Sequence, residues 1–304
     1  MVSILSMFMF LNDIYFVDPN FLFFFSSWEY PTSSGVGCNT KSNNDTANFL
    51  SFLQELRKDS FGSKLIISLA VTLKPFMGPD GLTPLTNVSA FTDVVDWLAI
   101  MNYDDWGDWS ASVGPNSPLN DSCAATANQA GSALSAAKAW IAAGAPANQI
   151  LLGVPAYGHS FAVNKTEAYY PGTTNLQPYP KFNSSVHQKG DAWDNNTLLD
   201  VCGNLQPNSS TYTLWGAIAA GFLEQDGTNA KGMPYRFDNC SQTVSFFFSF
   251  RVVEPSIHRL WLSHLYIIPR PKSCCHTITL KYVLKIKSSS FGDIITFSPF
   301  STVV

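Results

Sequence analysis

Three short clusters of polar and aromatic residues carry the side chains best suited to catalysis. They are Trp28-Glu29-Tyr30-Pro31, Met101-Asn102-Tyr103-Asp104 and Pro155-Ala156-Tyr157-Gly158. A carboxylic acid such as Glu29 can protonate the leaving group of a bond that is being broken. Taken singly, each residue type has a more ordinary interpretation, because such a glutamate is usually a surface carboxylate and most tyrosines and tryptophans pack in the core.

The residues around the clusters predict alternating helices and strands. Asn44-Asp45-Thr46 offers caps for a helix that Gly62 ends, and the apolar run 64–71 lacks alternation, as in a strand of a parallel sheet buried on both faces. The pattern continues with a helix over 88–95, a strand over 97–102, a helix over 129–143 and a strand over 150–156. This order is typical of a (β/α) barrel or a doubly wound sheet.

In a (β/α) barrel, catalytic side chains lie at the carboxyl ends of the strands, which is where the three clusters fall. Beyond about residue 160 the composition shifts to Asn, Ser, Pro and Tyr, with one expected helix at 214–223 and an extended segment at 233–237. This second stretch indicates an α+β insertion.

Composition and charge exclude several partners. A net charge of −4 and the absence of a basic run argue against nucleic acid, and no apolar segment is long enough to span a bilayer. Cys38, Cys123, Cys202 and Cys240 have no metal-binding spacing, so we expect disulfides and neither a metal nor a cofactor. Chain order suggests Cys38 with Cys123 and Cys202 with Cys240, although four cysteines allow three connectivities.

Eight Asn-X-Ser/Thr sequons predict a glycosylated, secreted, extracellular protein, because so many exceed what composition alone would give. They begin at Asn44, Asn87, Asn120, Asn164, Asn183, Asn195, Asn208 and Asn239.

Taken in series, four motifs resemble family 18 chitinases. They are W-E-Y-P at 28–31, S-L-A-V at 68–71, M-N-Y-D-x-W-G at 101–107 and G-V-P-A-Y-G-H-S-F at 153–161, and the resemblance covers about 28–243. It implies a partial (β/α)8 TIM barrel over 28–159 and an α+β chitinase insertion domain over 160–243. Segments 1–27 and 244–304 then lie outside the family.

The resemblance implies retaining hydrolysis of β-1,4-linked N-acetylglucosamine in chitin or chitooligosaccharides. The acetamido oxygen of the substrate attacks the anomeric carbon, an exception to the two-carboxylate scheme. Glu29 matches the acid, Tyr103 the donor to the acetamido oxygen and Asp104 a sugar contact. Met101 and Tyr157 match the acetamide pocket, and Trp28, Trp106 and Trp109 offer faces for sugar rings. His159 and His187 are expected to be structural or solvated.

The sequence departs from the family just before the proposed acid. Family members carry D-x-x-D-x-D-x-E, whereas Leu22, Phe25 and Ser27 occupy the three aspartate positions here. Glu29 therefore lacks its partner, and we expect a very poor catalyst. The alternatives are a chitin-binding, lectin-like protein and a non-functional fragment.

Both end segments differ in composition from the middle. Residues 1–27 hold seven Phe and no Lys, Arg or Gly, and the tail after about 243 holds one of nineteen Gly. Translated non-coding sequence is one interpretation of these ends. The alternatives are a weak anchor or a hydrophobic first strand at the N-terminal end, and a genuine β segment at the C-terminal end. We expect the protein to act as a monomer.

Overall fold

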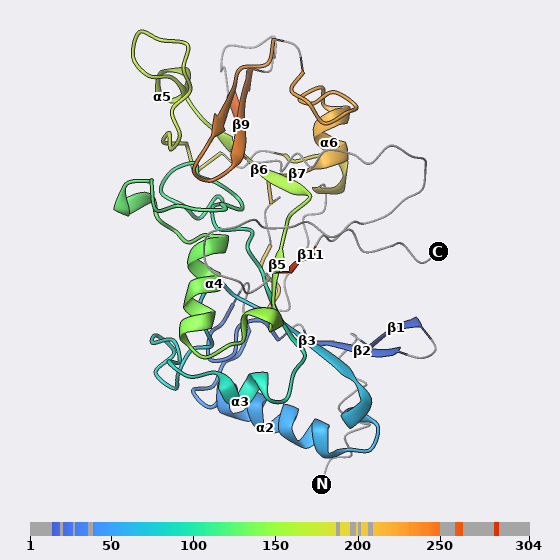
Figure 1. Ribbon diagram of the computed structural model, residues 1–304. Coiled ribbons are helices and arrows are strands. Elements are labelled where there is room, and N and C mark those ends of the chain that lie inside the picture. The colour runs from blue at the N-terminus through green and yellow to red at the C-terminus, as the bar shows by residue number, and fades with distance from the viewer. Residues whose placement is uncertain are drawn as a thin grey trace. The chain divides into compact units, whose positions relative to one another are not determined.

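The computed structural model describes residues 14–18, 21–26, 28–35, 39–186, 189–194, 199, 202–205, 209–230, 232–249, 259–263 and 283–285. The chain forms two compact units. Unit 1 comprises Met1–Met101, Ser135–Gly153 and Tyr282–Val304, and unit 2 comprises Asn102–Leu134 and Val154–Lys281. Figure 1 labels several elements of each unit.

Unit 1 is built on a mixed sheet of six described strands in the order β1-β2-β3-β4-β5-β11. The central strands β2 (Phe21–Ser26), β3 (Ile66–Val71), β4 (Trp97–Ile100) and β5 (Ile150–Gly153) run parallel. The strands β1 (Ile14–Asp18) and β11 (Val283–Lys285) pair antiparallel at the two edges. The parallel centre confirms the expected partial α/β barrel architecture.

Helices supply much of the apolar core of unit 1. They are α2 (Asp45–Lys58), α3 (Ser89–Thr92) and the part of α4 (Ala133–Ala142) from Ser135 onward, with short 3₁₀ turns η1 (Gly62–Lys64) and η3 (Ala147–Gln149). Helix α2 contacts α3, as Figure 1 shows. The α2 residues Phe49, Leu53 and Leu56 are at most 1% exposed, which matches their expected spacing on one helix face.

Unit 2 contains an antiparallel sheet in the order β7-β6-β10-β9-β8. Its strands are β6 (Tyr157–Ala162), β7 (Thr211–Thr213), β8 (Tyr235–Asp238), β9 (Thr243–Ser249) and β10 (Arg259–Ser263). The helices α5 (Lys165–Ala168) and α6 (Leu214–Ala219) and the 3₁₀ turns η2 (Thr126–Asn128) and η4 (Ala192–Asp194) complete the unit.

Strands occupy parts of both end segments. Strand β2 lies just before Trp28 and pairs with β3, and β9 runs to Ser249 with Val244, Phe246 and Phe247 buried. Within the described residues no helix is long and apolar enough to cross a membrane.

The suggested pairing of Cys123 with Cys38 and of Cys202 with Cys240 is wrong. Cys123 is bonded to Cys240, with Cα atoms 6.3 Å apart. The turn after β8 lies beside the loop that carries Cys123, since the N–H of Leu119 donates to the carbonyl of Ser241 at 2.9 Å. The cysteines therefore pair according to their proximity in the fold and not according to their order along the chain. Cys202 is also disulfide-bonded, and Cys38 lies outside the described residues.

Candidate functional site

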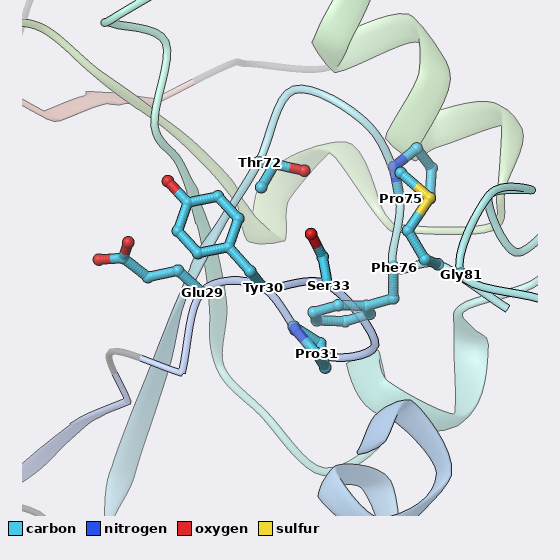
Figure 2. Close-up of a pocket in the computed structure, with 9 residues that line it drawn as sticks. Glu29, Tyr30, Pro31, Ser33, Thr72, Pro75, Phe76 and Gly81 are labelled. Carbon is cyan, nitrogen blue, oxygen red and sulfur yellow. The ribbon is translucent and has the colours of Figure 1, made fainter. Parts of the chain in front are cut away.

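In unit 1 the proposed acid lies in a small pocket at the carboxyl ends of two parallel strands. The loop after β2 supplies Glu29, and the loop after β3 supplies Thr72 and Phe76 (Figure 2). The pocket has a volume of about 130 Å³ and is lined by Glu29, Tyr30, Pro31, Ser33, Thr72, Pro75, Phe76, Met77 and Gly81. This is the edge of a parallel sheet where catalytic groups are expected.

Burial raises the pKa of the Glu29 carboxyl above its ordinary value of 4.5, and a hydrogen bond with Tyr30 opposes the rise. A raised pKa is what a general acid requires, since the group must keep its proton near the working pH. The neighbouring Trp28 is 40% exposed, and its ring packs on Phe49 with centroids 5.2 Å apart.

The two family acid positions nearest to Glu29 hold no carboxylate. Phe25 is half-buried in β2 and lies opposite Ser68 of β3, while Ser27 lies outside the described residues. No neighbouring carboxylate contributes to the raised pKa of Glu29, which burial causes. Glu29 is present, but the family's aspartate two positions before it is replaced by Ser27.

In unit 2 the second group of predicted site residues comes together around Asp104. The phenol of Tyr157 donates to Asp104 Oδ1 at 2.7 Å, and His159 Nε2 lies 2.8 Å from the same oxygen. The ring of Tyr103 lies 6.4 Å from that of Tyr157, edge to face. Because a carboxylate can only accept hydrogen bonds, we assign the proton of His159 to Nε2.

Opposing effects act on the ionisable groups of this cluster. Burial alone would raise the pKa of Asp104, but the hydrogen bonds from His159 and Tyr157 outweigh it and hold that pKa below its ordinary value. Burial and the negative charge of Asp104 raise the pKa of Tyr157 well above its ordinary value. Asp104 is therefore a carboxylate and Tyr157 a neutral donor at physiological pH.

The remaining predicted contacts occupy different environments. Met101 follows β4 in unit 1, and its N–H donates to the carbonyl of Val71 at 2.8 Å. Trp106 is only 6% exposed and packs on Tyr179, with ring centroids 5.5 Å apart. Trp109 is 64% exposed, so it presents an open ring face that Trp106 does not.

Sequence reasoning missed two residues of the cluster in unit 2. His159 was expected to be structural or solvated, yet it is 6% exposed and bonds directly to Asp104. Burial and the charges of Asp104 and Asp121 raise the pKa of Asp105 to about 8, and its Oδ2 is buried without a hydrogen-bond partner. Two adjacent acids in the sequence, Asp104 and Asp105, could have indicated that Asp105 belongs to the cluster. His187 lies outside the described residues.

Among the residues that the structure describes, no group of three His, Cys, Asp or Glu side chains could hold a metal ion. The polar groups of the Glu29 pocket and of the Asp104 cluster are carboxyls, phenols, hydroxyls and one imidazole. Such groups can donate and accept hydrogen bonds and can transfer a proton.

Comparison with known proteins shows which protein family the chain resembles. The profile described as "Glycosyl hydrolases family 18" matches residues 26–250. A chitinase-like effector of Moniliophthora roreri is 51% identical over 218 residues, which are 71% of this chain and 52% of that protein. A chitinase-like effector of Moniliophthora perniciosa is 50% identical, covering 71% of this chain and 49% of that protein.

Solved structures agree with the sequence comparison. The crystal structure of a chitinase from Rhizomucor miehei superposes with a TM-score of 0.66 at 33% identity, covering 81% of this chain and 62% of that one. The chain thus spans about half the length of the two effector relatives. The matched region begins three residues before Glu29 and includes the Asp104 cluster.

Proposed function

The chain belongs to glycosyl hydrolase family 18, and from this premise we propose that it binds chitooligosaccharides and hydrolyses their β-1,4 links slowly, with retention. The observation that supports this proposal most is the Asp104 cluster, in which a carboxylate and a neutral phenol are held 2.7 Å apart. A carboxylate held in this way can accept a hydrogen bond from a sugar.

In the proposed mechanism Glu29 protonates the glycosidic oxygen as the bond to the leaving sugar breaks. The acetamido oxygen of the substrate attacks the anomeric carbon and takes the place of an enzyme nucleophile. Tyr103 donates to that acetamido group, and Asp104 accepts a hydrogen bond from the sugar. The family resemblance assigns Tyr157 and Met101 to contacts with the acetamide.

Sugar rings stack their axial C–H groups on flat aromatic faces. Trp28 and Trp109 support this role because they are 40% and 64% exposed. Trp106, which is 6% exposed, is better suited to packing.

Turnover should be slow because Phe25 and Ser27 replace two aspartates of the family motif. Without a carboxylate two positions before Glu29, no neighbouring group relays its proton or orients the acetamide for attack. Loss of one positioned proton-transfer group costs about 10²–10⁴-fold in rate.

A second candidate function is chitooligosaccharide binding without hydrolysis. The missing aspartates favour it, and so do the relatives named chitinase-like effectors, which are 50–51% identical over about half of their own length. The retained Glu29 favours the enzyme, because a binding protein has no need of that acid.

One experiment separates the two candidates. Binding of tetra-N-acetylchitotetraose is measured by calorimetry and its cleavage by chromatography, for the wild type, Glu29→Gln and Ser27→Asp. Slow cleavage that Glu29→Gln abolishes and Ser27→Asp accelerates supports the enzyme, with Ser27→Asn as the matched control. Binding without cleavage in any variant supports the second candidate, and absence of both rejects the proposal.

The same proposal includes secretion and N-glycosylation. The sequon asparagines at 44, 87, 164, 183 and 239 are exposed, Asn120 is half-buried, and Asn195 and Asn208 lie outside the described residues. Expression through a yeast secretory pathway should give a mass that falls on treatment with peptide N-glycosidase F. An unchanged mass would contradict glycosylation. Size-exclusion chromatography tests the expected monomer.

A further inference from the structure

A fully buried asparagine connects the two strand ends that carry the Asp104 cluster. Asn116 is 0% exposed and lies in the loop between β4 and η2. Its Oδ1 accepts a hydrogen bond from the N–H of Asp104 at 2.9 Å, and its Nδ2 donates to the carbonyl of Tyr157 at 3.1 Å. Its own carbonyl accepts from the N–H of Asp105 at 3.2 Å. One residue thus binds three backbone positions of the site.

The backbone of Asp104 needs this support. Its φ of 59° lies in the left-handed region, which is uncommon for a residue with a side chain. Such a conformation persists where surrounding contacts hold it. Since the Asp104 N–H donates to Asn116, the strained residue is fixed where its carboxylate can meet Tyr157 and His159.

The chemistry of the contact requires an amide. Oδ1 accepts a hydrogen bond from the Asp104 N–H, and Nδ2 donates one to the Tyr157 carbonyl. A single planar amide group supplies both the acceptor and the donor. Aspartate has no donor for the Tyr157 carbonyl and would add a negative charge next to Asp104. Alanine would leave both part-buried backbone groups without this partner, which is costly.

We propose that Asn116 is a positioning residue for chitooligosaccharide binding, whose amide holds Asp104 and Tyr157 in the mutual placement that lets Asp104 accept a hydrogen bond from the sugar. The role rests on the proposed function, although the placement of the two backbones does not. Asn116 bonds backbone atoms of Asp104, Asp105 and Tyr157, so it acts through the cluster.

The test compares Asn116→Ala with Gln149→Ala. Gln149 is a matched control in unit 1, because its Nε2 also donates to two backbone carbonyls, those of Thr92 at 3.1 Å and Val95 at 3.2 Å. Both variants should lose thermal stability. Only Asn116→Ala should weaken tetra-N-acetylchitotetraose binding, by about tenfold, the loss expected when one buried hydrogen-bond partner is removed.

A double variant tests whether Asn116 acts through Tyr157. Tyr157→Phe removes the phenol that donates to Asp104. If Asn116 serves the same cluster, adding Asn116→Ala to Tyr157→Phe should cost clearly less than tenfold, whereas independent effects would multiply. A full further tenfold loss would overturn the proposal.

A ligand-free measurement separates this inference from the proposed function. Hydrogen–deuterium exchange of segments 102–106 and 156–158 should be faster in Asn116→Ala than in Gln149→Ala. If the wild type binds no oligosaccharide but this difference is present, the proposed function fails and the positioning role of Asn116 stands. If affinity and exchange in these segments are the same in both variants, the inference is wrong.

Discussion

At the scale of single residues, burial of Glu29 sets the pH range of the proposed acid. Burial raises the pKa of Glu29 and the bond with Tyr30 opposes that rise, so the proton-donating form is lost as the pH increases through the raised pKa. Tyr30→Phe should raise the pKa further and move the alkaline fall in hydrolysis to higher pH. Profiles of kcat against pH for both proteins would check this. An unmoved alkaline limb would contradict it.

Asp105 should make the folded state less stable as the pH rises. Its pKa is about 8 in the folded protein against an ordinary value of 3.8, so between these values the folded state keeps a proton that the unfolded chain releases. Stability therefore falls as the pH increases from about 4 to about 8 and is level above that. Asp105→Asn should remove this slope, so that its gain in stability over the wild type is larger at pH 8 than at pH 4.

Urea denaturation at several pH values would test the Asp105 prediction. Asp80 provides a control, because hydrogen bonds from the Thr83 side chain and from backbone N–H groups lower its pKa to about 2. Asp80→Asn should leave the slope between pH 4 and pH 8 as it is in the wild type. A slope that survives in Asp105→Asn would show that another group causes it.

At the scale of elements, apolar spacing predicted the type of each helix and strand from α2 to β5, but not their ends. Helix α4 was expected from 129 and begins at Ala133. The N–H of Gly131 and the hydroxyl of Ser132 donate to Asp121, and the N–H of Ala133 donates to the carbonyl of Pro118. These long-range bonds hold the preceding residues in other conformations, and no local pattern reveals them.

The part of the candidate site whose residues lie next to strands in the sequence could be predicted. Asp104 and Tyr157 follow or begin strands in recognisable motifs, so their meeting could be expected. Asn116 could not be predicted, because it lies 41 residues from Tyr157 in a loop without periodicity. His159 was passed over since the proposed chemistry requires no imidazole, although its position two residues after Tyr157 on one strand places both on the same face.

The packing of α2 supports the loop that carries Glu29. Phe49 is 1% exposed and its ring lies within 5.2–6.2 Å of the rings of Trp28, Phe76 and Phe91. Phe49→Ala should destabilise unit 1 by about 3–5 kcal/mol, whereas Phe49→Leu, which leaves a smaller cavity, should cost less. Urea denaturation measures both. Equal stability of Phe49→Ala and the wild type would contradict this account of the core.

At the scale of the whole molecule, the two proposed chemical roles belong to different compact units. Glu29 lies in unit 1 with the pocket of Figure 2, and the Asp104 cluster lies in unit 2. Each unit has its own sheet. The effect of a substitution that destabilises one unit can therefore be distinguished from the effect of one that removes a chemical group. Both binding and turnover must be measured to make this distinction.

The disulfide between Cys123 and Cys240 should contribute strongly to the stability of unit 2. It joins residues 117 apart, and closing a loop of this length removes about 4–5 kcal/mol of unfolded-chain entropy. Cys123→Ala with Cys240→Ala should lower the urea midpoint by a corresponding amount. Reductant alone is a poor test, because Cys202 is bonded too. Because the unfolded chain of the double variant is no longer cross-linked and exposes more surface, its denaturation slope should be steeper than that of the wild type. A midpoint equal to that of the wild type would show that β8 and β9 hold the loop without the bond.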